Sequence, residues 1–298
     1  KHVIEQLARI PVETDVASEY RYRNPIIDQH TLVIVVSQSG ETADTLAALR
    51  EAKRQGARVI AITNVVGSSV AREADDTIIT WAGPEIAVAS TKAYTSQLIV
   101  FYLLGMHFAQ LLGTADPALI ENILTHLQQL PAQVQTILHQ AENIKAIAEK
   151  ISTHDNLFFI GRGLDYAVVQ EGSLKLKEIS YIHSEAYAAG ELKHGTLALI
   201  EHGTPVIALA TQTDVMEKTV SNIIEVRARG AYVLGIASEG DDVLQKSVDE
   251  VFYIPKTLDL LSPALSVVPL QLLAYYASLA RGNDVDKPRN LAKSVTVE

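Results

Sequence analysis

The stretch Val33–Leu46, VIVVSQSGETADTL, changes character halfway along. Its first four residues are β-branched and apolar, as in a buried strand, and a small polar segment, SQSGET, follows them directly. A helical pattern then begins and runs to about Gln55. A buried strand that leads through a polar loop into a helix is the first half of a strand–helix–strand unit.

The residues after this stretch continue the alternation of strands and helices. Apolar strands are predicted at 58–63 and 77–80, and helices at 42–55 and 90–112. Strands that alternate with helices of this length predict a parallel sheet with helices on both faces. We therefore expect an α/β, doubly wound, flavodoxin-like fold. The longest apolar stretch, 98–106, is too short to span a bilayer and predicts a buried helix.

The chain contains an internal repeat. A shift of 174 residues places Gln38 on Gln212 and the strand pattern at 58–63 on that at 232–237. The two segments need no gap from Val33 to Tyr102. Strand falling on strand and turn on turn over such a span indicates two tandem copies of one α/β unit.

The second copy opens with a strand that the first copy lacks. This strand, at 156–160, ends in Gly-Arg-Gly and leads into a helix predicted at 165–182. The matching strand of the first copy would precede residue 1, and residues 1–9 match the end of its helix. Because the chain begins with Lys1 rather than Met, we expect it to be a fragment.

We expect four parts along the chain. They are a first subdomain without its opening strand, a helical connector, a second subdomain and a tail that closes the active site, at residues 1–113, 114–152, 153–281 and 282–298. Within the connector, Pro117 and Pro131 each predict the start of a helix.

The composition excludes several classes of function. A net charge of −10 without a basic run argues against a nucleic-acid or anionic-membrane surface. The absence of cysteine excludes disulfides and thiolate chemistry, and indicates a reducing, cytoplasmic location. Since no histidine pair has the spacing of a metal site, we predict no metal and no cofactor.

The loop SQSGET is predicted to bind an anion. It lies at the carboxyl end of a strand, where parallel sheets bind ligands, and its hydroxyl and amide groups lie at the positive end of a helix. The loop has no lysine and differs from a Walker P-loop, so a sugar phosphate suits it better than a nucleoside triphosphate with magnesium. Helix capping explains a single Ser39 or Thr42, but four hydroxyl or amide side chains in six residues exceed what capping requires.

The second copy reads TQTDVM at the same place, with Asp214 where the first copy has Gly40. A carboxylate at that position would repel a phosphate. We therefore expect the phosphate in the first copy only.

A lysine falls on the apolar face of the helix predicted at 165–182. At about 100° per residue, Lys175 lies inside the apolar arc, and Glu171 and Glu178 flank it. A buried lysine beside two carboxylates is either a structural ion pair or part of a semi-buried site with a carboxylate base. The pattern alone leaves both alternatives open.

A histidine lies in a glycine-flanked segment further along. The stretch EAYAAGELKHGTLALI places His194 close to Glu191 and Lys193, between two glycines. Such a histidine can reach a ligand and titrates near neutral pH, although an isolated histidine is more often a surface residue.

These residues together resemble the sugar isomerase (SIS) fold in two tandem copies, and more closely the isomerase half of the glutamine–fructose-6-phosphate amidotransferase family. The resemblance covers essentially all 298 residues. SQSGET is a moderately specific motif, whereas KLKEISYIHSEAYAAGELKHG and the terminal PRNLAKSVTVE are highly specific. EIAVASTKAYTSQL matches as well.

The resemblance implies a role for each of several residues. Glu178 would be the base that moves a proton between carbon 1 and carbon 2, and Lys175 would stabilise the enediol-like intermediate. His194 would open the sugar ring from the neighbouring subunit, and Lys293 would form a Schiff base with the open-chain ketose. The residues implied in substrate binding are Ser37, Gln38, Ser39 and Thr42 for the phosphate, and Val88, Ser90 and Ala292 for the sugar.

The implied reaction is the conversion of fructose 6-phosphate and ammonia to glucosamine 6-phosphate, with an aldose–ketose isomerisation, in a homodimer with a shared active site. The family's N-terminal glutaminase domain begins with a nucleophilic cysteine. This chain has no cysteine, so we expect it not to hydrolyse glutamine. The alternatives are a sugar-phosphate sensor without catalysis, or a related deglycase or ketose isomerase, against which the terminal PRNLAKSVTVE argues.

Overall fold

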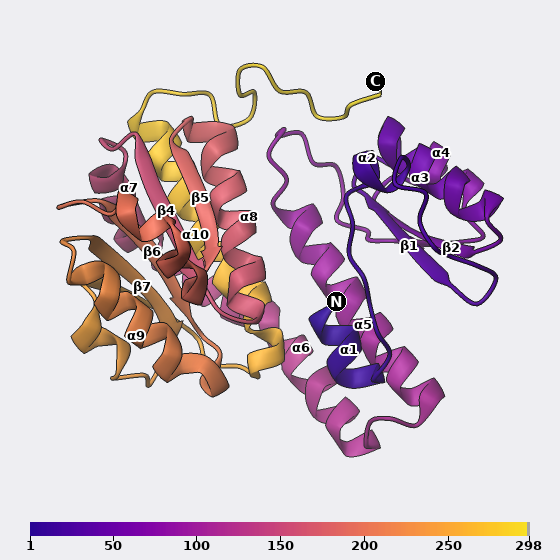
Figure 1. Cartoon of the computed structure of the whole chain (residues 1–298), viewed down its shortest axis with the longest axis horizontal. Coiled ribbons are helices and arrows are strands. Elements are labelled where there is room, and N and C mark those ends of the chain that lie inside the picture. The colour runs from indigo at the N-terminus through magenta and orange to yellow at the C-terminus, as the bar shows by residue number, and fades with distance from the viewer. Residues whose placement is uncertain (297–298) are drawn as a thin grey trace. The chain divides into compact units, whose positions relative to one another are not determined.

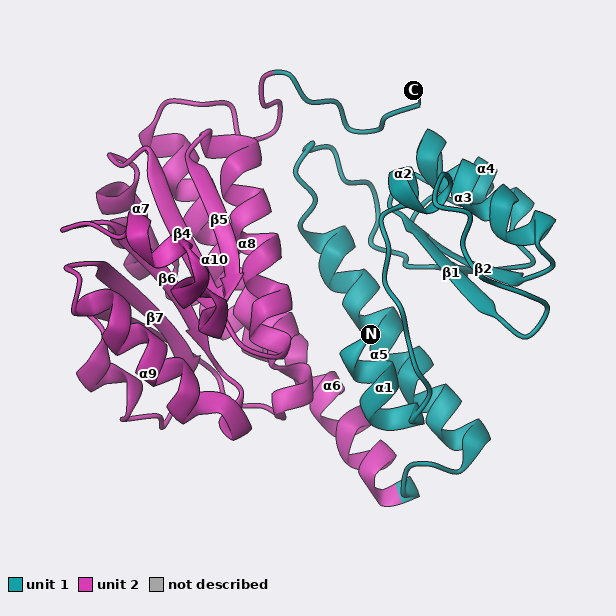
Figure 2. Cartoon of the chain, in the orientation of Figure 1, with its two compact units in different colours: residues 1–117, 290–298 teal, residues 118–289 magenta. Residues whose placement is uncertain are grey.

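The structure is a computed structural model that describes residues 1–296, and the chain divides into two compact units (Figures 1 and 2). Unit 1 is Lys1–Pro117 with the tail from Asn290, and unit 2 is Ala118–Arg289. Most of the predicted connector therefore belongs to unit 2, and the predicted tail divides at Asn290. The last two residues of that tail, 297–298, lie outside the described residues.

Unit 1 contains a sheet of three parallel strands in the order β1-β2-β3. They are β1 (Leu32–Ser37), β2 (Arg58–Thr63) and β3 (Asp76–Ile79), each within a residue of its prediction. The register pairs Ser37 with Thr63 at the carboxyl ends of β1 and β2. The polar loop therefore starts at an edge strand of the sheet.

Helices cover both faces of this sheet, as predicted. On one face, Leu49 and Ala52 of α3 (Ala43–Arg54) pack against Val35 and Val59. On the other, α5 (Lys92–Leu112) packs Val100 and Leu104 against Ile62. The remaining helices of the unit are α1 (His2–Ala8), α2 (Ala17–Tyr20) and α4 (Ser69–Glu73).

Unit 2 contains a parallel sheet in the order β5-β4-β6-β7-β8. Under the shift of 174 residues, β6, β7 and β8 correspond to β1, β2 and β3, and both sheets keep the same order. In unit 2, β4 pairs with β6, whereas the equivalent edge of β1 carries no strand among residues 1–296. The strands are β4 (Asn156–Gly161), β5 (His183–Ala188), β6 (Pro205–Ala210), β7 (Tyr232–Ser238) and β8 (Glu250–Ile254).

Unit 2 contains one long helix that we predicted as two. The prediction that Pro131 starts a helix is wrong, because α6 (Pro117–His139) continues through it. Pro131 removes one backbone hydrogen bond, and the buried Leu130 and Ile137 hold the helix in place. The other helices are α7 (Ala141–Ile151), α8 (Leu164–Ser180), α9 (Met216–Arg227) and α10 (Ser262–Ala280).

Two helical segments of the described chain, α5 and Asp259–Ala280, are long and apolar enough to cross a membrane by length and composition alone. The apolar stretch 98–106 forms the middle of α5, which has 21 residues, and 33% of the apolar window of this helix is buried within the protein. Core helices meet the same criterion, and 78% of the second segment is buried within the protein.

The contact between α8 and α10 is close enough to require a glycine. A Cβ atom at Gly172 of α8 would lie 2.6 Å from Cδ1 of Leu270 on α10. Leu270 is itself buried among other apolar residues of α10, so it has little room to move.

We predict that Gly172→Ala destabilises the protein although alanine favours helices by about 1 kcal/mol. Overpacking costs about 1–3 kcal/mol, so the free energy of unfolding should fall by up to about 2 kcal/mol in urea denaturation. Lys177→Ala, at an exposed position of the same helix, is the control and should change stability little. A Gly172→Ala variant more stable than the parent would show that Leu270 moves aside at no cost.

Candidate active site

The loop SQSGET folds back on itself between β1 and α3. The Oγ atom of Ser37 accepts the N–H of Gly40 at 3.0 Å and lies 3.0 Å from Oγ1 of Thr42. The Oγ atom of Ser39 accepts the N–H of Glu41 at 3.2 Å. The hydroxyl side chains thus hold the loop in a tight curve at the start of α3.

Gly40 lies where this loop touches the start of α4. Its φ is +67°, and a Cβ atom would lie 2.1 Å from Oγ of the buried Ser68. Its carbonyl accepts a hydrogen bond from the N–H of Val70 at 2.9 Å. The carboxylate of Glu41 accepts a hydrogen bond from the N–H of Ser69 at 2.8 Å. A side chain at residue 40 would therefore displace the loop.

Backbone N–H groups remain open at the start of α3. Within residues 1–296, the N–H groups of Ser39 and Thr42 donate no hydrogen bond, whereas that of Ala43 donates to the Val295 carbonyl at 3.1 Å. Open N–H groups at a helix N-terminus attract anions. The loop can therefore receive a phosphate group, and the half-buried Gln38 lies in the same turn.

The equivalent loop of unit 2 has its donors occupied by the protein's own carboxylates. Asp165 accepts the N–H of Thr211 at 2.7 Å and its hydroxyl at 2.5 Å. Asp259 accepts the N–H of Thr213 at 2.8 Å. Because Thr213 corresponds to Ser39 in the repeat, the N–H group that is open in unit 1 is satisfied internally in unit 2.

The second loop has two further carboxylates that the sequence pattern did not indicate. Asp214, which was expected to repel a phosphate, is exposed. Asp165, which is 1% exposed, and Asp259 accept the hydrogen bonds from the N–H groups of this loop. They come from α8 and from the start of the segment leading into α10, which sequence patterns do not connect to this loop.

Asp165 makes this arrangement sensitive to pH. Burial raises the pKa of its carboxyl to about 6, although hydrogen bonds from Thr211 and Gln212 oppose the rise. The reference value is 3.8, so the folded protein binds this proton more tightly than the unfolded chain does. The resulting stabilisation is present below about pH 4 and is lost as the pH rises through about 6.

We predict that Asp165→Asn weakens the dependence of the free energy of unfolding on pH between about pH 4 and pH 7. In the parent protein the group should lower the free energy of unfolding by up to about 3 kcal/mol between pH 4 and pH 7, and the amide cannot titrate. Urea denaturation at a series of pH values measures the slope. Asp214→Asn, which removes the exposed carboxylate of the same loop, should keep the parent slope. Equal slopes for Asp165→Asn and the parent would contradict the assignment.

Helix α8 buries Lys175 beside two carboxylates, as the predicted helical face requires. The Nζ atom lies 2.5 Å from Oε2 of Glu178 and 3.5 Å from Oε1 of Glu171. The Lys175 side chain is 5% exposed, and those of Glu171 and Glu178 are 12% and 21% exposed. The Oε2 atom of Glu178 is buried, so other atoms of that side chain face solvent or a ligand. The site thus holds a buried lysine next to a partly exposed carboxylate.

His194 ends the short 3₁₀ turn η1 (Ala189–His194), which follows β5. Its ring is 73% exposed, with Nε2 4.0 Å from Glu191, while the neighbouring Lys193 pairs with Glu225 at 2.8 Å. The described contacts do not join His194 to Glu178.

The tail of unit 1 brings together two residues that were predicted for the site. The Nζ atom of Lys293 donates to the Ala87 carbonyl at 2.8 Å, to Glu85 at 3.0 Å and to the hydroxyl of Ser90 at 3.3 Å. Lys293 is therefore docked, although its sequence context alone resembles a solvated tail. Val88 is half-buried beside this contact, and Ala292 is exposed. Glu85 carried no signal in the sequence.

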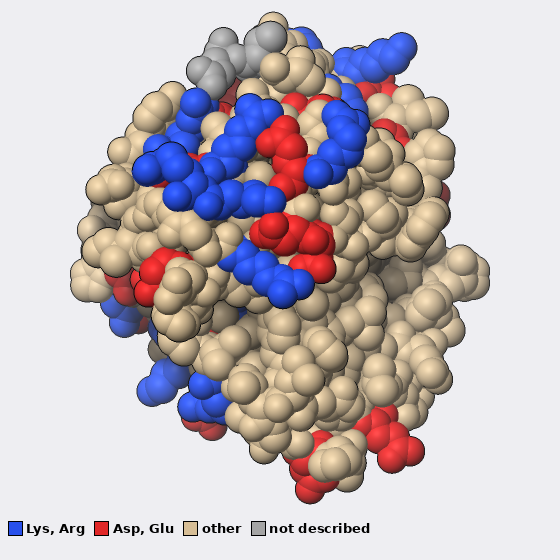
Figure 3. All heavy atoms as spheres, turned by 90° about the vertical axis from the view of Figure 1, so that its right-hand side faces the viewer, with Lys and Arg blue, Asp and Glu red and all other residues tan. Residues whose placement is uncertain are grey.

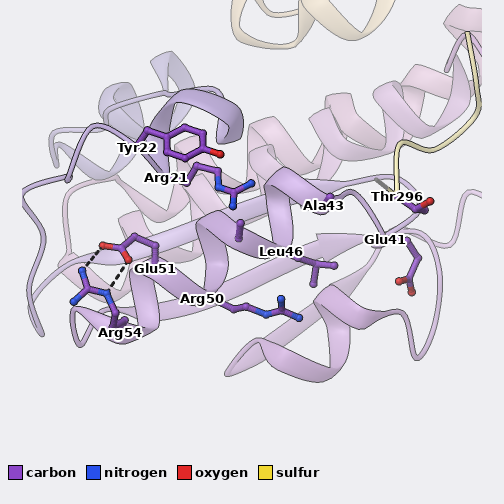
Figure 4. A pocket seen from close by; sticks show the side chains of 10 residues that line it. Arg21, Tyr22, Glu41, Ala43, Leu46, Arg50, Glu51, Arg54 and Thr296 are labelled. Atoms are coloured by element: carbon purple, nitrogen blue, oxygen red, sulfur yellow. Dashed lines mark hydrogen bonds and ion pairs between the residues drawn. The ribbon is translucent and has the colours of Figure 1, made fainter. Parts of the chain in front are cut away.

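Unit 1 also has a surface pocket of about 630 Å³ along α3 (Figure 4). Its arginines are paired, Arg50 with Glu73 and Arg54 with Glu51, each at 2.7 Å. Basic and acidic side chains also lie next to one another on the face in Figure 3. We assign no ligand to this pocket, because its guanidinium groups already have acidic partners. The lining residues are Arg21, Tyr22, Glu41, Ala43, Leu46, Ala47, Arg50, Glu51, Arg54 and Thr296.

The fold and the two loops define the class of protein. A family model for the SIS domain matches residues 1–106 and 150–281. The chain therefore belongs to the SIS domain family, as the sequence motifs predicted.

Within that family, the similarity extends over the whole chain to one group of enzymes. The chain is 64% identical to the glutamine–fructose-6-phosphate aminotransferase (isomerizing) of Clostridium tetani and 51% identical to that of Thermus thermophilus, in each case over all 298 residues. It spans about half the length of these curated relatives, 49% of each.

Solved structures agree with this similarity. The C-terminal domain of glucosamine-fructose-6-phosphate aminotransferase from Francisella tularensis superposes with a TM-score of 0.93 at 40% identity, covering 97% of this chain and 82% of that one. A glucosamine-6-phosphate deaminase from Thermotoga maritima superposes with a TM-score of 0.78 at 26% identity, covering 99% of this chain and 84% of that one.

Proposed function

We propose that this chain is the isomerase part of a glutamine–fructose-6-phosphate aminotransferase, and that it converts fructose 6-phosphate and ammonia to glucosamine 6-phosphate. The observation that carries the proposal is the open pair of N–H groups at Ser39 and Thr42, in contrast to the filled loop of unit 2. The buried Lys175–Glu178 pair, the docked Lys293 and the similarity to the named relatives support it.

The phosphate of the substrate binds to the loop SQSGET. Its oxygens accept hydrogen bonds from the open N–H groups of Ser39 and Thr42. They also accept hydrogen bonds from the side chains of the loop, which are the hydroxyl groups of Ser37, Ser39 and Thr42 and the amide group of Gln38. Such a site holds one end of the sugar through many short hydrogen bonds without a metal ion. The sugar carbons then extend toward the residues predicted for the sugar, which are Val88, Ser90 and Ala292.

Lys293 supplies the covalent step. Its neutral amine adds to carbon 2 of the open-chain ketose, and loss of one water molecule leaves an imine. Ammonia then displaces the lysine nitrogen and forms the imine of the product series. Lys293 returns as a free amine, so the lysine is not consumed.

Glu178 moves the proton that changes the ketose into the aldose. Its carboxylate takes a proton from carbon 1 and returns it to carbon 2, while the hydroxyl proton at carbon 1 passes to the nitrogen at carbon 2, so that the imine becomes the amine, the hydroxyl becomes the aldehyde and glucosamine 6-phosphate is formed. Lys175 lies beside it and stabilises the negative charge that develops on the oxygen at carbon 1. An isolated ion pair without this role would be a costly feature for the core of α8.

Ammonia and a second subunit complete the proposal. Ammonia comes from an N-terminal glutaminase domain that this chain does not include. His194 opens the sugar ring in the neighbouring subunit of a homodimer, for which its exposed position is suited. We expect the protein to act in the cytoplasm.

A related deaminase is the second candidate, favoured by the structural similarity to the Thermotoga maritima protein. Two incubations distinguish the candidates. With fructose 6-phosphate alone, the isomerase should form glucose 6-phosphate, and added ammonium should yield glucosamine 6-phosphate. A deaminase should instead release ammonia from glucosamine 6-phosphate with a strong preference for that direction. Binding without any product would indicate a sensor and refute both enzymes.

We predict that Glu178→Gln lowers the turnover of fructose 6-phosphate by about two to four powers of ten, because the amide cannot accept the proton. Binding of the sugar phosphate should persist, since the phosphate loop is unchanged. A coupled assay for glucose 6-phosphate and a calorimetric titration measure the two quantities. Glu217→Gln, at an exposed position on α9, is the matched control. Turnover near that of the parent in Glu178→Gln would refute its role as the base.

A further inference from the structure

Glu85 connects the C-terminal tail to the start of α5. Its side chain is only 4% exposed. One carboxylate oxygen accepts the N–H groups of Thr91 at 2.8 Å and Ala93 at 3.3 Å, and the other accepts the ammonium of Lys293 at 3.0 Å. The carboxylate therefore has a fixed orientation, and this orientation determines where Lys293 docks.

The surroundings of Lys293 match an ammonium rather than an amine. Three acceptors contact its Nζ atom, namely the carboxylate of Glu85, the carbonyl of Ala87 and the hydroxyl of Ser90. An ammonium has three N–H donors, whereas a neutral amine has two and a lone pair that would face one of these acceptors. The docked lysine is thus held in the form that cannot attack a carbonyl carbon.

The internal repeat shows that this use of the carboxylate is specific to unit 1. The shift of 174 residues places Glu85 on Asp259. In unit 2, Asp259 accepts the N–H of Thr213 and closes the loop. In unit 1, Glu85 instead binds the helix start and Lys293, and the equivalent N–H of Ser39 stays open. The acidic residue at this position of the repeat therefore has a different partner in each copy. Asp259 accepts a loop N–H group in unit 2, and Glu85 binds Lys293 of the tail in unit 1.

We propose that Glu85 is a positioning residue that holds Lys293 docked as an ammonium between turnovers. This inference rests on the proposed function of Lys293. For each turnover the ammonium loses one proton to solvent, leaves Glu85, and adds as an amine to the ketone, from which water then departs. Glu85 keeps its negative charge and contacts no reacting carbon.

The charge of Glu85 is constant around neutral pH. Burial raises the pKa of its carboxyl, but the hydrogen bonds from Thr91, Lys293 and Ala93 outweigh burial and leave the pKa below its ordinary value. The other two groups in contact with Lys293 are an uncharged carbonyl and an uncharged hydroxyl. Glu85 therefore supplies the only charge among these three acceptors of the docked Lys293.

Competitive acetylation with acetic anhydride, read by mass spectrometry over a range of pH, tests this proposal without any sugar. In Glu85→Gln, Lys293 should be acetylated about tenfold faster near pH 8 than in the parent chain, as expected for the loss of an adjacent opposite charge that holds the ammonium in place. Lys145, whose side chain is 43% exposed, is the internal reference. Glu73→Gln, which removes a surface carboxylate of unit 1, is the matched control and should label like the parent.

Equal labelling of Lys293 in the parent and in Glu85→Gln would overturn the proposal. Glu85→Asp keeps the charge and should label more slowly than Glu85→Gln, which keeps the test valid if the latter folds poorly. Borohydride trapping with fructose 6-phosphate in the same samples tests the proposed function separately. If no variant forms an adduct at Lys293, the imine role fails, while the acetylation profile still decides the role of Glu85.

Discussion

The first N–H groups of a helix need acceptors, and this requirement shapes the carboxyl ends of both sheets. In unit 2, side chains of the protein supply the acceptors, because Asp165 and Asp259 accept hydrogen bonds from N–H groups of the loop before α9. In unit 1, the serine hydroxyls curve the loop but leave the N–H groups of Ser39 and Thr42 open. A duplicated fold thus offers an external anion one site rather than two, since the other already contains its own anions.

The buried charged side chains likewise have partners of opposite charge or hydrogen-bond donors beside them. Lys175 is buried because Glu171 and Glu178 lie beside it, and Glu85 is buried because it binds Lys293 and the start of α5. Removing one member of such a pair leaves an unpaired charge in a poorly solvated place, which is costly. Each pair therefore keeps its charged side chains in a defined place within its own unit.

Much of the fold followed from the sequence, because strong local patterns determined it. The strand at 58–63 matches β2 residue for residue, and Lys175 lies on the buried face that its helical period requires. Other features depend on contacts between distant segments. The edge strand β5 has no clear alternation of apolar residues, and Pro131 is tolerated because packing outweighs its local preference. Asp165 fills the second loop across 46 residues of chain, which no local pattern reveals.

The central claim is that the anion of the substrate binds in the first copy because only there are the helix donors open. A crystal structure with fructose 6-phosphate tests it most directly. We expect the phosphate on Ser37–Thr42, with the N–H groups of Ser39 and Thr42 donating to it, and with Asp165 still bonded to Thr211. A phosphate bound at Thr211–Thr213, with the first loop empty, would contradict the account.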